Sequence, residues 1–327
     1  MNKLYLIEIS LIFTICFLFP LNLLYADSNF QNWLTLTKND AIKAGISEKT
    51  YSNITKDLKK INPKVLSYYN NQPEFKITFN NYIKRNISPK RISTGRKKIY
   101  ANLDILNKIS SIYFIPPEII VSIWGIETNY GSYTGGFKVL ESLATLAYLS
   151  KRKVFFKKEF LNAIKIIDDG LISKKFLTGS WAGAMGQSQF MPSSYLNYAV
   201  DFSKDEKIDI WNTKSDIFAS MSNYLKKHGW APNQPWSFEI DKKEFDLIRK
   251  LKIKEIDYKT IVSNQLADKE YLKRFKKPFK GTFKIVGKKN EERYFIVFKN
   301  FYVLKKYNNS DFYALTVGSL ANKIINR

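Results

Sequence analysis

Glu127 is the residue whose surroundings best suit acid–base chemistry. It lies in residues 115–131, which read IPPEIIVSIWGIETNYG. Pro116 and Pro117 suit the first turn of a helix, because the amide hydrogen that proline lacks has no helical partner there. Glu118 suits the positive end of the same helix. The segment therefore predicts a helix that begins at the prolines and ends just after Glu127.

Helical spacing places Glu127 on an apolar face. Ile119, Ile120 and Ile123 recur at three- and four-residue intervals, and Glu127 continues their row. A carboxyl group with little water around it resists ionisation, so we expect the pKa of Glu127 to be raised. A carboxyl that keeps its proton at neutral pH can serve as a general acid. The alternative is a helix-end glutamate that caps or pairs at the surface.

Residues 179–195, GSWAGAMGQSQFMPSSY, form a second informative segment. Its three glycines and two alanines allow the backbone to approach a ligand closely. It has neither the lysine of a phosphate-binding loop nor the spacing of a dinucleotide-binding fold, so nucleotide binding is not expected. Ser180, Gln187, Ser188 and Gln189 place neutral hydrogen-bonding groups among apolar ones. That mixture is typical of sugar-binding sites.

The sequence contains a single cysteine, Cys16, and a single histidine, His228. Cys16 lies inside an N-terminal apolar run, and the residues before it do not form a lipid-attachment motif. His228 precedes Gly229 and suits a helix C-terminus. A serine triad, a cysteine nucleophile and a zinc site with several histidine ligands are therefore excluded. The chemistry must depend on a carboxylate.

Three segments together resemble the membrane-bound lytic transglycosylase B family of peptidoglycan-cleaving enzymes. They are residues 126–131 (IETNYG), 183–195 (GAMGQSQFMPSSY) and 227–230 (KHGW). Their order and approximate spacing are kept from about residue 72 to near the C-terminus. The resemblance implies a lysozyme-like fold and cleavage of the bond between N-acetylmuramic acid (MurNAc) and N-acetylglucosamine (GlcNAc) without water, leaving a 1,6-anhydro sugar. Glu127 would be the acid and then the base.

The resemblance also implies which residues bind the substrate. Ser180 would orient the acetamido group, and Lys151 with Arg152 would contact the peptide stem. The basic pair also fits an ordinary exposed helix connection. Phe155 stands where some relatives have a tyrosine, so one hydrogen bond is expected to be missing. The remaining expected contacts are Tyr82, Gln189, Tyr224, Tyr307, Asn308 and Tyr313.

Residues 201–209, DFSKDEKID, resemble the EF-hand-like metal loop of some relatives. Calcium prefers such oxygen ligands, but a glutamate replaces the glycine of the sharp turn and two lysines add positive charge. We therefore expect no cofactor and at most weak calcium binding, with a surface turn as the alternative. The candidate metal ligands are Asp201, Ser203, Asp205 and Asp216.

The N-terminus predicts export. Lys3 precedes an apolar run that ends at Leu24, and residues 1–26 are typical of a secretory signal peptide cut after Ala26. An uncleaved membrane anchor is the alternative, because Leu24 is large for its position near the cut. We expect a periplasmic protein, with membrane association as a further alternative.

The formal net charge is +24, from 53 Lys and Arg against 29 Asp and Glu. This excess favours anionic partners. The lysines are scattered along the chain instead of forming one stripe, so nucleic acid is not expected. The expected partners are peptidoglycan glycan strands, and other cell-wall enzymes are further candidates. We expect a monomer.

The fold class expected is α+β, mainly α. After the signal peptide we expect an N-terminal helical region (27–98), a lysozyme-like helical catalytic core (99–235), a small antiparallel β unit (236–298) and a C-terminal return to the core (299–327). Ser47 is a predicted N-cap. The basic residues 90–98 are predicted to be a solvated linker before a helix at 99–111. Further predicted helices are 140–149, 155–168, 216–229 and 311–325, and predicted strands are 282–286 and 294–298, joined by a turn at 287–290.

Two rival functions share these features. A hydrolytic muramidase would use the same acid and fold, and a catalytically inactive wall-binding protein would keep the fold alone. The motifs beside Glu127 contain no second carboxylate to activate a water molecule. However, Asp168 or Asp169 could fold into the cleft and supply one.

Overall fold

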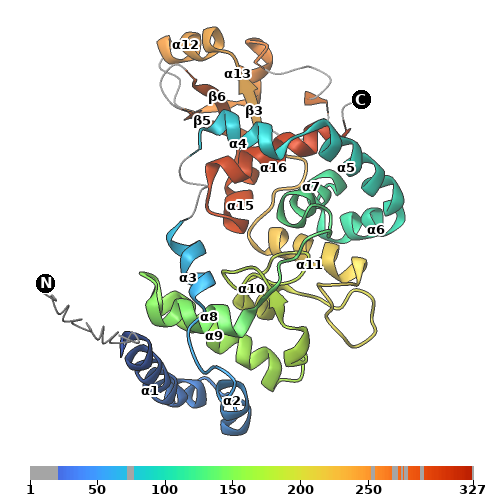
Figure 1. Ribbon diagram of the computed structural model, residues 1–327. Helices are drawn as coiled ribbons and strands as arrows, with labels where there is room; N and C mark the ends of the chain where they lie inside the picture. Colours follow the sequence, from blue (N-terminus) through green and yellow to red (C-terminus); the bar gives the residue numbers. More distant parts are fainter. Residues whose placement is uncertain are drawn as a thin grey trace, which may run out of the picture.

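The computed structural model describes residues 21–71, 77–251, 255–266, 272–273, 275, 279–287 and 291–325. Helices dominate (Figure 1). They are α1 (Leu21–Lys43), α2 (Glu48–Thr55), α3 (Pro63–Asn70), α4 (Phe79–Asn86), α5 (Pro89–Ala101), α6 (Leu103–Tyr113), α7 (Pro117–Thr128), α8 (Val139–Leu149), α9 (Lys153–Asp168), α10 (Pro192–Tyr198), α11 (Lys214–Lys227), α12 (Lys242–Lys250), α13 (Tyr258–Ser263), α15 (Lys299–Tyr307) and α16 (Asp311–Ile325). The strands are β1 (Phe137–Lys138), β2 (Thr178–Gly179), β3 (Ser237–Ile240), β4 (Ile256–Asp257), β5 (Lys280–Val286) and β6 (Arg293–Val297).

Helix α7 occupies the centre of the fold, among α5, α6, α11 and α16 (Figure 1). Pro116 is its N-cap and Pro117 its first residue, as the sequence predicts. All residues from Ile119 to Gly125 are buried, because the helix is covered by neighbours on every side. The helix ends at Thr128, and the left-handed Asn129 is its C-cap. Glu127 therefore lies in its last turn.

The N-terminal helices pack against α9 and fix the position of Asp168. Ser47 caps α2, as predicted, by accepting a hydrogen bond from the amide of Thr50. Asp168 in turn accepts hydrogen bonds from the hydroxyl and the amide of Ser47, at 2.5 and 2.9 Å. These bonds, the side-chain one first, lower the pKa of Asp168 to about 2. This carboxylate serves the α2–α9 contact.

The small β unit is an antiparallel sheet in the order β3-β6-β5-β4. Phe283 of β5 lies opposite Ile296 of β6, and the sheet buries one face with α12 and α13 in a small core of its own. In Figure 1 it lies at the opposite end of the molecule from α1 and α2. The predicted strands 282–286 and 294–298 are confirmed, with shifts of one or two residues at their ends. Residues 288–290 of the predicted turn lie outside the described residues.

The prediction of a solvated linker at residues 90–98 is wrong, because this segment is helical and forms most of α5. Ser88 accepts a hydrogen bond from the amide of Arg91, and Pro89 occupies the first helical position, so a standard start signal precedes the segment. The high charge of the segment suggests full exposure, but Gly95 within it is buried. A Cβ at this position would lie only 2.5 Å from Cδ1 of Ile324. Helix α5 therefore packs closely on α16, and the predicted helix at 99–111 is displaced to α6.

Most of the predicted signal segment, residues 1–20, lies outside the described residues, and cleavage after Ala26 stays a prediction. Within the described ranges no single helix is long and apolar enough to cross a membrane. Helices α6 and α7 meet the length and composition criteria only when taken together, and they are bent by 111° at the break between them.

The chain leaves α7 through three successive left-handed residues, Asn129, Tyr130 and Gly131, with φ of 49°, 60° and 82°. A Cβ on Gly131 would lie 2.2 Å from Oε1 of Gln187. That oxygen already accepts a hydrogen bond from Nε1 of Trp124 at 2.8 Å, so it is not free to retreat. Only glycine satisfies both the conformation and the space.

We therefore predict that Gly131→Ala destabilises the fold by about 2–4 kcal/mol, because a strained φ and a displaced buried amide add together. The melting temperature should fall by about 5–10 °C. Gly136→Ala is the matched control, since a Cβ there meets nothing within 4 Å. Equal melting temperatures for the two variants would contradict this account of the turn.

Candidate active site

Glu127 and Tyr313 form the centre of the candidate site. Oη of Tyr313, on α16, donates a hydrogen bond to Oε1 of Glu127 at 2.6 Å. Burial, followed by the Glu127 carboxyl, raises the pKa of Tyr313 well above its usual value, so its hydroxyl keeps its proton. Glu127 is partly exposed, and a substrate can therefore reach it from solvent. The raised pKa expected for Glu127 stays a prediction.

Two further tyrosines extend this centre into an aromatic wall. Tyr307 of α15 donates its hydroxyl to the carbonyl of Ser188 at 2.7 Å, and Tyr224 of α11 donates to the carbonyl of Lys306. The ring centroids lie 4.9 Å apart between Tyr224 and Tyr307 and 6.4 Å apart between Tyr307 and Tyr313. Three tyrosines from three different helices thus gather beside Glu127, as the sequence resemblance implied.

Tyr82 of α4 lies on the same side of the molecule. Its ring centroid is 5.7 Å from that of Phe312, the residue before Tyr313. The Tyr82 hydroxyl also contributes, as the smallest of several causes, to the raised pKa of Tyr313. The described contacts therefore bring four of the expected tyrosines to one region.

The glycine-rich segment 179–191 forms a compact loop next to this region. Ser180 directly follows β2, and its Oγ accepts hydrogen bonds from the amides of Ala182 and Ala184 at 3.3 and 3.0 Å. Gln189, at a left-handed φ of 50°, donates its side-chain amide to the carbonyls of Thr134 and Gly186 at 3.1 and 2.9 Å. The loop itself holds Ser180, which remains half-exposed, whereas Gln189 is held both by the loop and by the carbonyl of Thr134.

Gln187 joins the loop to the catalytic helix, a role that sequence analysis missed. Its Oε1 accepts a hydrogen bond from Nε1 of Trp124 at 2.8 Å, and its backbone carbonyl accepts one from Oγ1 of Thr128 at 3.3 Å. Its Oε1 also accepts from Nζ of Lys214 at 3.0 Å. These bonds fix the last turn of α7 against the loop. No spacing in the sequence pairs Gln187 with residues about 60 positions away.

Lys151, Arg152 and Asn308 lie less close to this centre. Lys151 and Arg152 are exposed between α8 and α9, where the guanidinium carbon of Arg152 is 4.1 Å from the ring centroid of Phe155. Asn308 is an exposed C-cap of α15 and directly follows Tyr307. Among the described contacts, none joins these three side chains to Glu127.

The two acids that could have supplied a second carboxylate are used elsewhere. Asp168 accepts hydrogen bonds from Ser47, as described above. Asp169 forms a salt bridge with Lys165 at the end of α9. Among the described contacts, neither acid meets a residue of the tyrosine wall. The structure therefore removes the two candidates that the sequence left open for an activated water.

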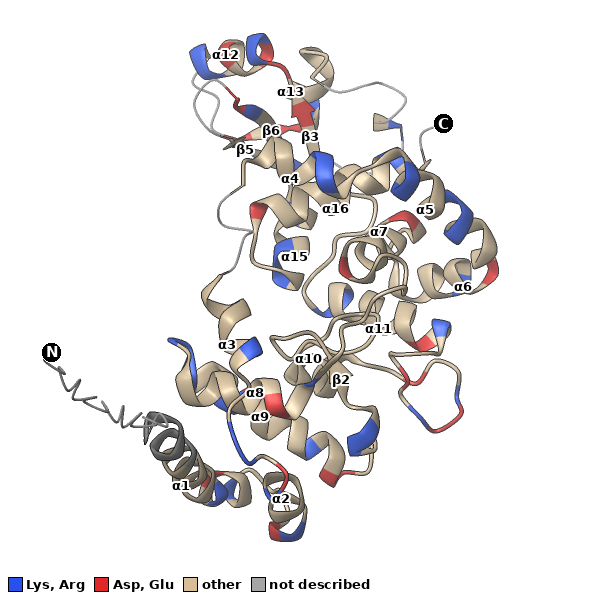
Figure 2. Ribbon diagram, in the orientation of Figure 1, with Lys and Arg blue, Asp and Glu red and all other residues tan. Residues whose placement is uncertain are grey.

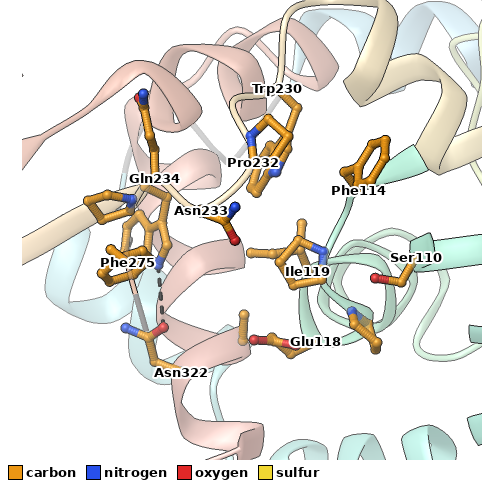
Figure 3. A pocket seen from close by; sticks show the side chains of 15 residues that line it. Ser110, Phe114, Glu118, Ile119, Trp230, Pro232, Asn233, Gln234, Phe275 and Asn322 are labelled. Atoms are coloured by element: carbon orange, nitrogen blue, oxygen red, sulfur yellow. Dashed lines mark hydrogen bonds between the residues drawn. The ribbon is translucent and has the colours of Figure 1, made fainter. Parts of the chain in front are cut away.

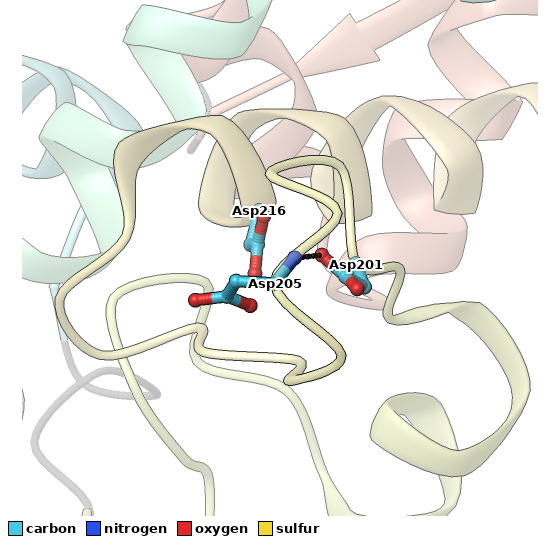
Figure 4. Close-up of side chains that lie close together, drawn as sticks. All are labelled: Asp201, Asp205 and Asp216. Carbon is cyan, nitrogen blue, oxygen red and sulfur yellow. Dashed lines mark hydrogen bonds between the residues drawn. The ribbon is translucent and has the colours of Figure 1, made fainter.

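The candidate metal ligands do gather (Figure 4). One carboxylate oxygen each from Asp201, Asp205 and Asp216 lies within 4.8 Å of the others. However, the oxygens of Asp201 already accept hydrogen bonds from the Ser203 hydroxyl and from three backbone amides of residues 204–206. Asp216 is buried and accepts three more backbone amides. The donor set suits calcium only in part.

A cavity of about 390 Å³ lies at the other end of α7 (Figure 3). Glu118 and Ile119 face it from the first turn of the helix, opposite Trp230 and Asn233. Nine residues of helix place Glu118 about 13 Å from Glu127 along the axis. None of the expected substrate-binding residues lines this cavity, so it is separate from the candidate active site.

Comparison with known proteins identifies a family to which the chain is similar. The sequence profile of the Transglycosylase SLT domain family matches residues 29–322. The chain is 32% identical over 257 residues to "Membrane-bound lytic murein transglycosylase B" of Escherichia coli (strain K12). That alignment covers 74% of this chain and 66%, slightly less than two thirds, of the relative.

Solved structures give the same result. SltB3 from Pseudomonas aeruginosa in complex with NAG-NAM-pentapeptide matches with a TM-score of 0.79 at 32% identity, over 91% of this chain and 80% of that one. The Escherichia coli lytic transglycosylase Slt35 in complex with calcium matches with a TM-score of 0.71 at 28% identity, over 91% and 93%. These matches confirm the predicted fold class, a mainly helical lysozyme-like α+β fold with small antiparallel sheets. The chain therefore belongs to the Transglycosylase SLT domain family.

Proposed function

We propose that the protein is a peptidoglycan lytic transglycosylase that cleaves the β-1,4 bond between MurNAc and GlcNAc and leaves 1,6-anhydroMurNAc ends. The observation that carries the proposal is Glu127, a single accessible carboxyl held by Tyr313 in a wall of tyrosines. The relatives support the substrate, since one is named a murein transglycosylase and another binds NAG-NAM-pentapeptide.

The geometry suggests how one carboxyl serves twice. Tyr313 donates to Oε1 of Glu127, and a protonated carboxyl group still has one O–H to donate. Glu127 gives this proton to the glycosidic oxygen as the bond from that oxygen to C1 of MurNAc breaks. The new carboxylate then takes the proton of the MurNAc C6 hydroxyl while that oxygen bonds to C1. Glu127 returns to its protonated form and no water is consumed.

Tyr313 also stabilises the intermediate state of this cycle. A hydrogen bond to an ionised carboxylate is stronger than one to a neutral carboxyl group. The bond from Tyr313 therefore strengthens once Glu127 has released its proton. Because the pKa of Tyr313 is raised, the hydroxyl keeps donating throughout.

The remaining site residues position the sugar and the peptide. Ser180, half-exposed at the end of β2, orients the acetamido group of MurNAc, which stabilises positive charge at C1. Tyr82, Tyr224 and Tyr307 provide ring surfaces for sugars. Asn308 assists at the rim, Gln189 shapes the glycine-rich loop, and Lys151 with Arg152 contacts the peptide stem.

Activity on the cell wall implies export. We propose that the protein is periplasmic and acts as a monomer on glycan strands, with membrane association and other cell-wall enzymes as further possibilities for its placement. The signal-like residues 1–26 and the matched relative's description as membrane-bound support this location.

The first test replaces the acid. Glu127→Gln should abolish lysis of purified sacculi while leaving the melting temperature unchanged, because the amide keeps the shape of the carboxyl but cannot donate its proton. Glu118→Gln, at the opposite end of the same helix, should retain activity. A well-folded Glu127→Gln variant that still lyses sacculi would refute the assignment.

The second test concerns the reaction type. Sacculi digested in oxygen-18 water should yield muropeptides with 1,6-anhydro ends and no label, because the MurNAc C6 oxygen replaces water as the nucleophile. Mass spectrometry separates these products, which are one water lighter than reducing ends. Mostly labelled, reducing ends would identify a hydrolytic muramidase, and release of no products would favour an inactive wall-binding protein.

The third test concerns calcium, which we propose binds weakly or not at all. With a Kd of about 1 mM or weaker, 1 mM calcium stabilises the fold by at most about 0.4 kcal/mol. The melting temperature should then rise by about 1 °C. A rise of many degrees that disappears in Asp201→Ala would show a real calcium site in the 201–216 loop.

A further inference from the structure

A basic recess of about 600 Å³ adjoins the turn that follows α7. Four cations line it, with no aspartate or glutamate among the lining residues. Figure 2 shows basic residues on α4 and α5, the two helices that supply these cations. The cations are Arg85, Lys90, Arg91 and Lys98, and Asn129 and Ser132 also line the recess.

None of these four cations forms a salt bridge within the described part of the chain. Arg91 is fixed from one side, because its Nη1 donates to the backbone and side-chain oxygens of Asn86 at 2.8 and 3.2 Å. Gathering like charges in a recess costs free energy unless an anion enters it.

Lys98 extends the positive charge toward the catalytic helix. Its Nζ lies 5.6 Å from the ring centroid of Trp124, and Nζ of Lys214 lies 4.8 Å from the same ring. Burial, and then the charge of Lys98, lowers the pKa of Lys214. The two lysines therefore share one aromatic ring on α7, one turn before Glu127.

The recess lies beside the candidate active site. Arg85 is three residues after Tyr82 on α4, so both share one helix face. Asn129 and Ser132 lie in the turn that starts two residues after Glu127. An anionic group carried by a bound glycan strand could thus reach the recess while a neighbouring bond lies at Glu127.

We propose that this recess binds the carboxylates of a peptide stem on the glycan strand that Glu127 cleaves, at a site distinct from Lys151 and Arg152. The proposal rests on the proposed function. Stem peptides carry several carboxylates, and the fork of an arginine matches a carboxylate with two hydrogen bonds. The recess is concave, and its lining residues include no leucine, isoleucine, valine or phenylalanine, which disfavours a membrane as the occupant.

The test uses a matched pair of double variants. Arg85→Gln with Lys98→Gln removes two charges from the recess, whereas Lys84→Gln with Lys97→Gln removes two charges from the neighbouring positions on the same helices. For stem-bearing strands, the recess variant should raise KM about tenfold with kcat unchanged. Strands freed of stems by an amidase should be cleaved with the KM of the unmodified protein. The control variant should keep both values.

A binding measurement separates this proposal from the proposed function. In the Glu127→Gln background, calorimetry with a NAG-NAM-pentapeptide fragment should show about tenfold weaker binding for the recess variant, and a stem-free disaccharide should show no difference. Lys90→Gln alone repeats the test should the double variant melt early.

Equal affinities for the stem-bearing fragment would overturn the proposal. So would tighter binding of inorganic phosphate or anionic vesicles, which would assign the recess to a phosphate ligand. Absence of cleavage by the unmodified protein would refute the proposed function and leave this binding result standing.

Discussion

The hydrogen bond from Tyr313 to Glu127 joins two helices whose bonded residues are 186 positions apart in the chain, and the candidate site depends on it. It can form only if α16 packs along α7. The same helix also packs on α5 at Gly95, where a Cβ would lie 2.5 Å from Cδ1 of Ile324. The buried face of α7 explains why the acid stays in place. A helix covered on all sides cannot rotate to move its last turn.

A second constraint acts from the opposite direction. The side-chain amide and the backbone carbonyl of Gln187 hold Trp124 and Thr128, which lie on either side of Glu127 in α7. The loop that supplies Gln187 also supplies the carbonyl bound by Tyr307. Acid, tyrosine wall and glycine-rich loop are therefore positioned by hydrogen bonds that meet at the last turn of α7 and at this loop. Such networks can be worth more than the sum of their pairwise deletions.

Local signals in the sequence predict many of the helices, caps and strands. They do not predict the contacts between residues that are far apart in the chain. The prolines before α7, the Ser47 cap and the strands of the small β unit all follow from residues within one element. The partners of Gln187 and the fates of Asp168 and Asp169 depend on how distant elements pack, which periodicity does not encode. At α5 the local helix signal is present in Ser88 and Pro89, but the high charge of residues 90–98 favours a solvated linker. The four tyrosines of the site are far apart in the sequence. They are predicted from the family resemblance, because no spacing rule connects them.

The charge of +24 acquires a more specific meaning from the structure. The wall beside Glu127 is built from neutral tyrosine, serine and glutamine side chains, which suit an uncharged sugar ring. The cations Arg85, Lys90 and Lys98 lie just beyond this wall, at the recess.

A long-range positive potential concentrates an anionic polymer near the surface, and the potential falls off within about 10 Å at ordinary salt. Short-range contacts in a neutral cleft then select the bond. If cations lined the cleft itself, they would pull stem carboxylates into the place of the sugar. Separating attraction from selection therefore allows one acid to act on a strand whose charges all lie on its side groups.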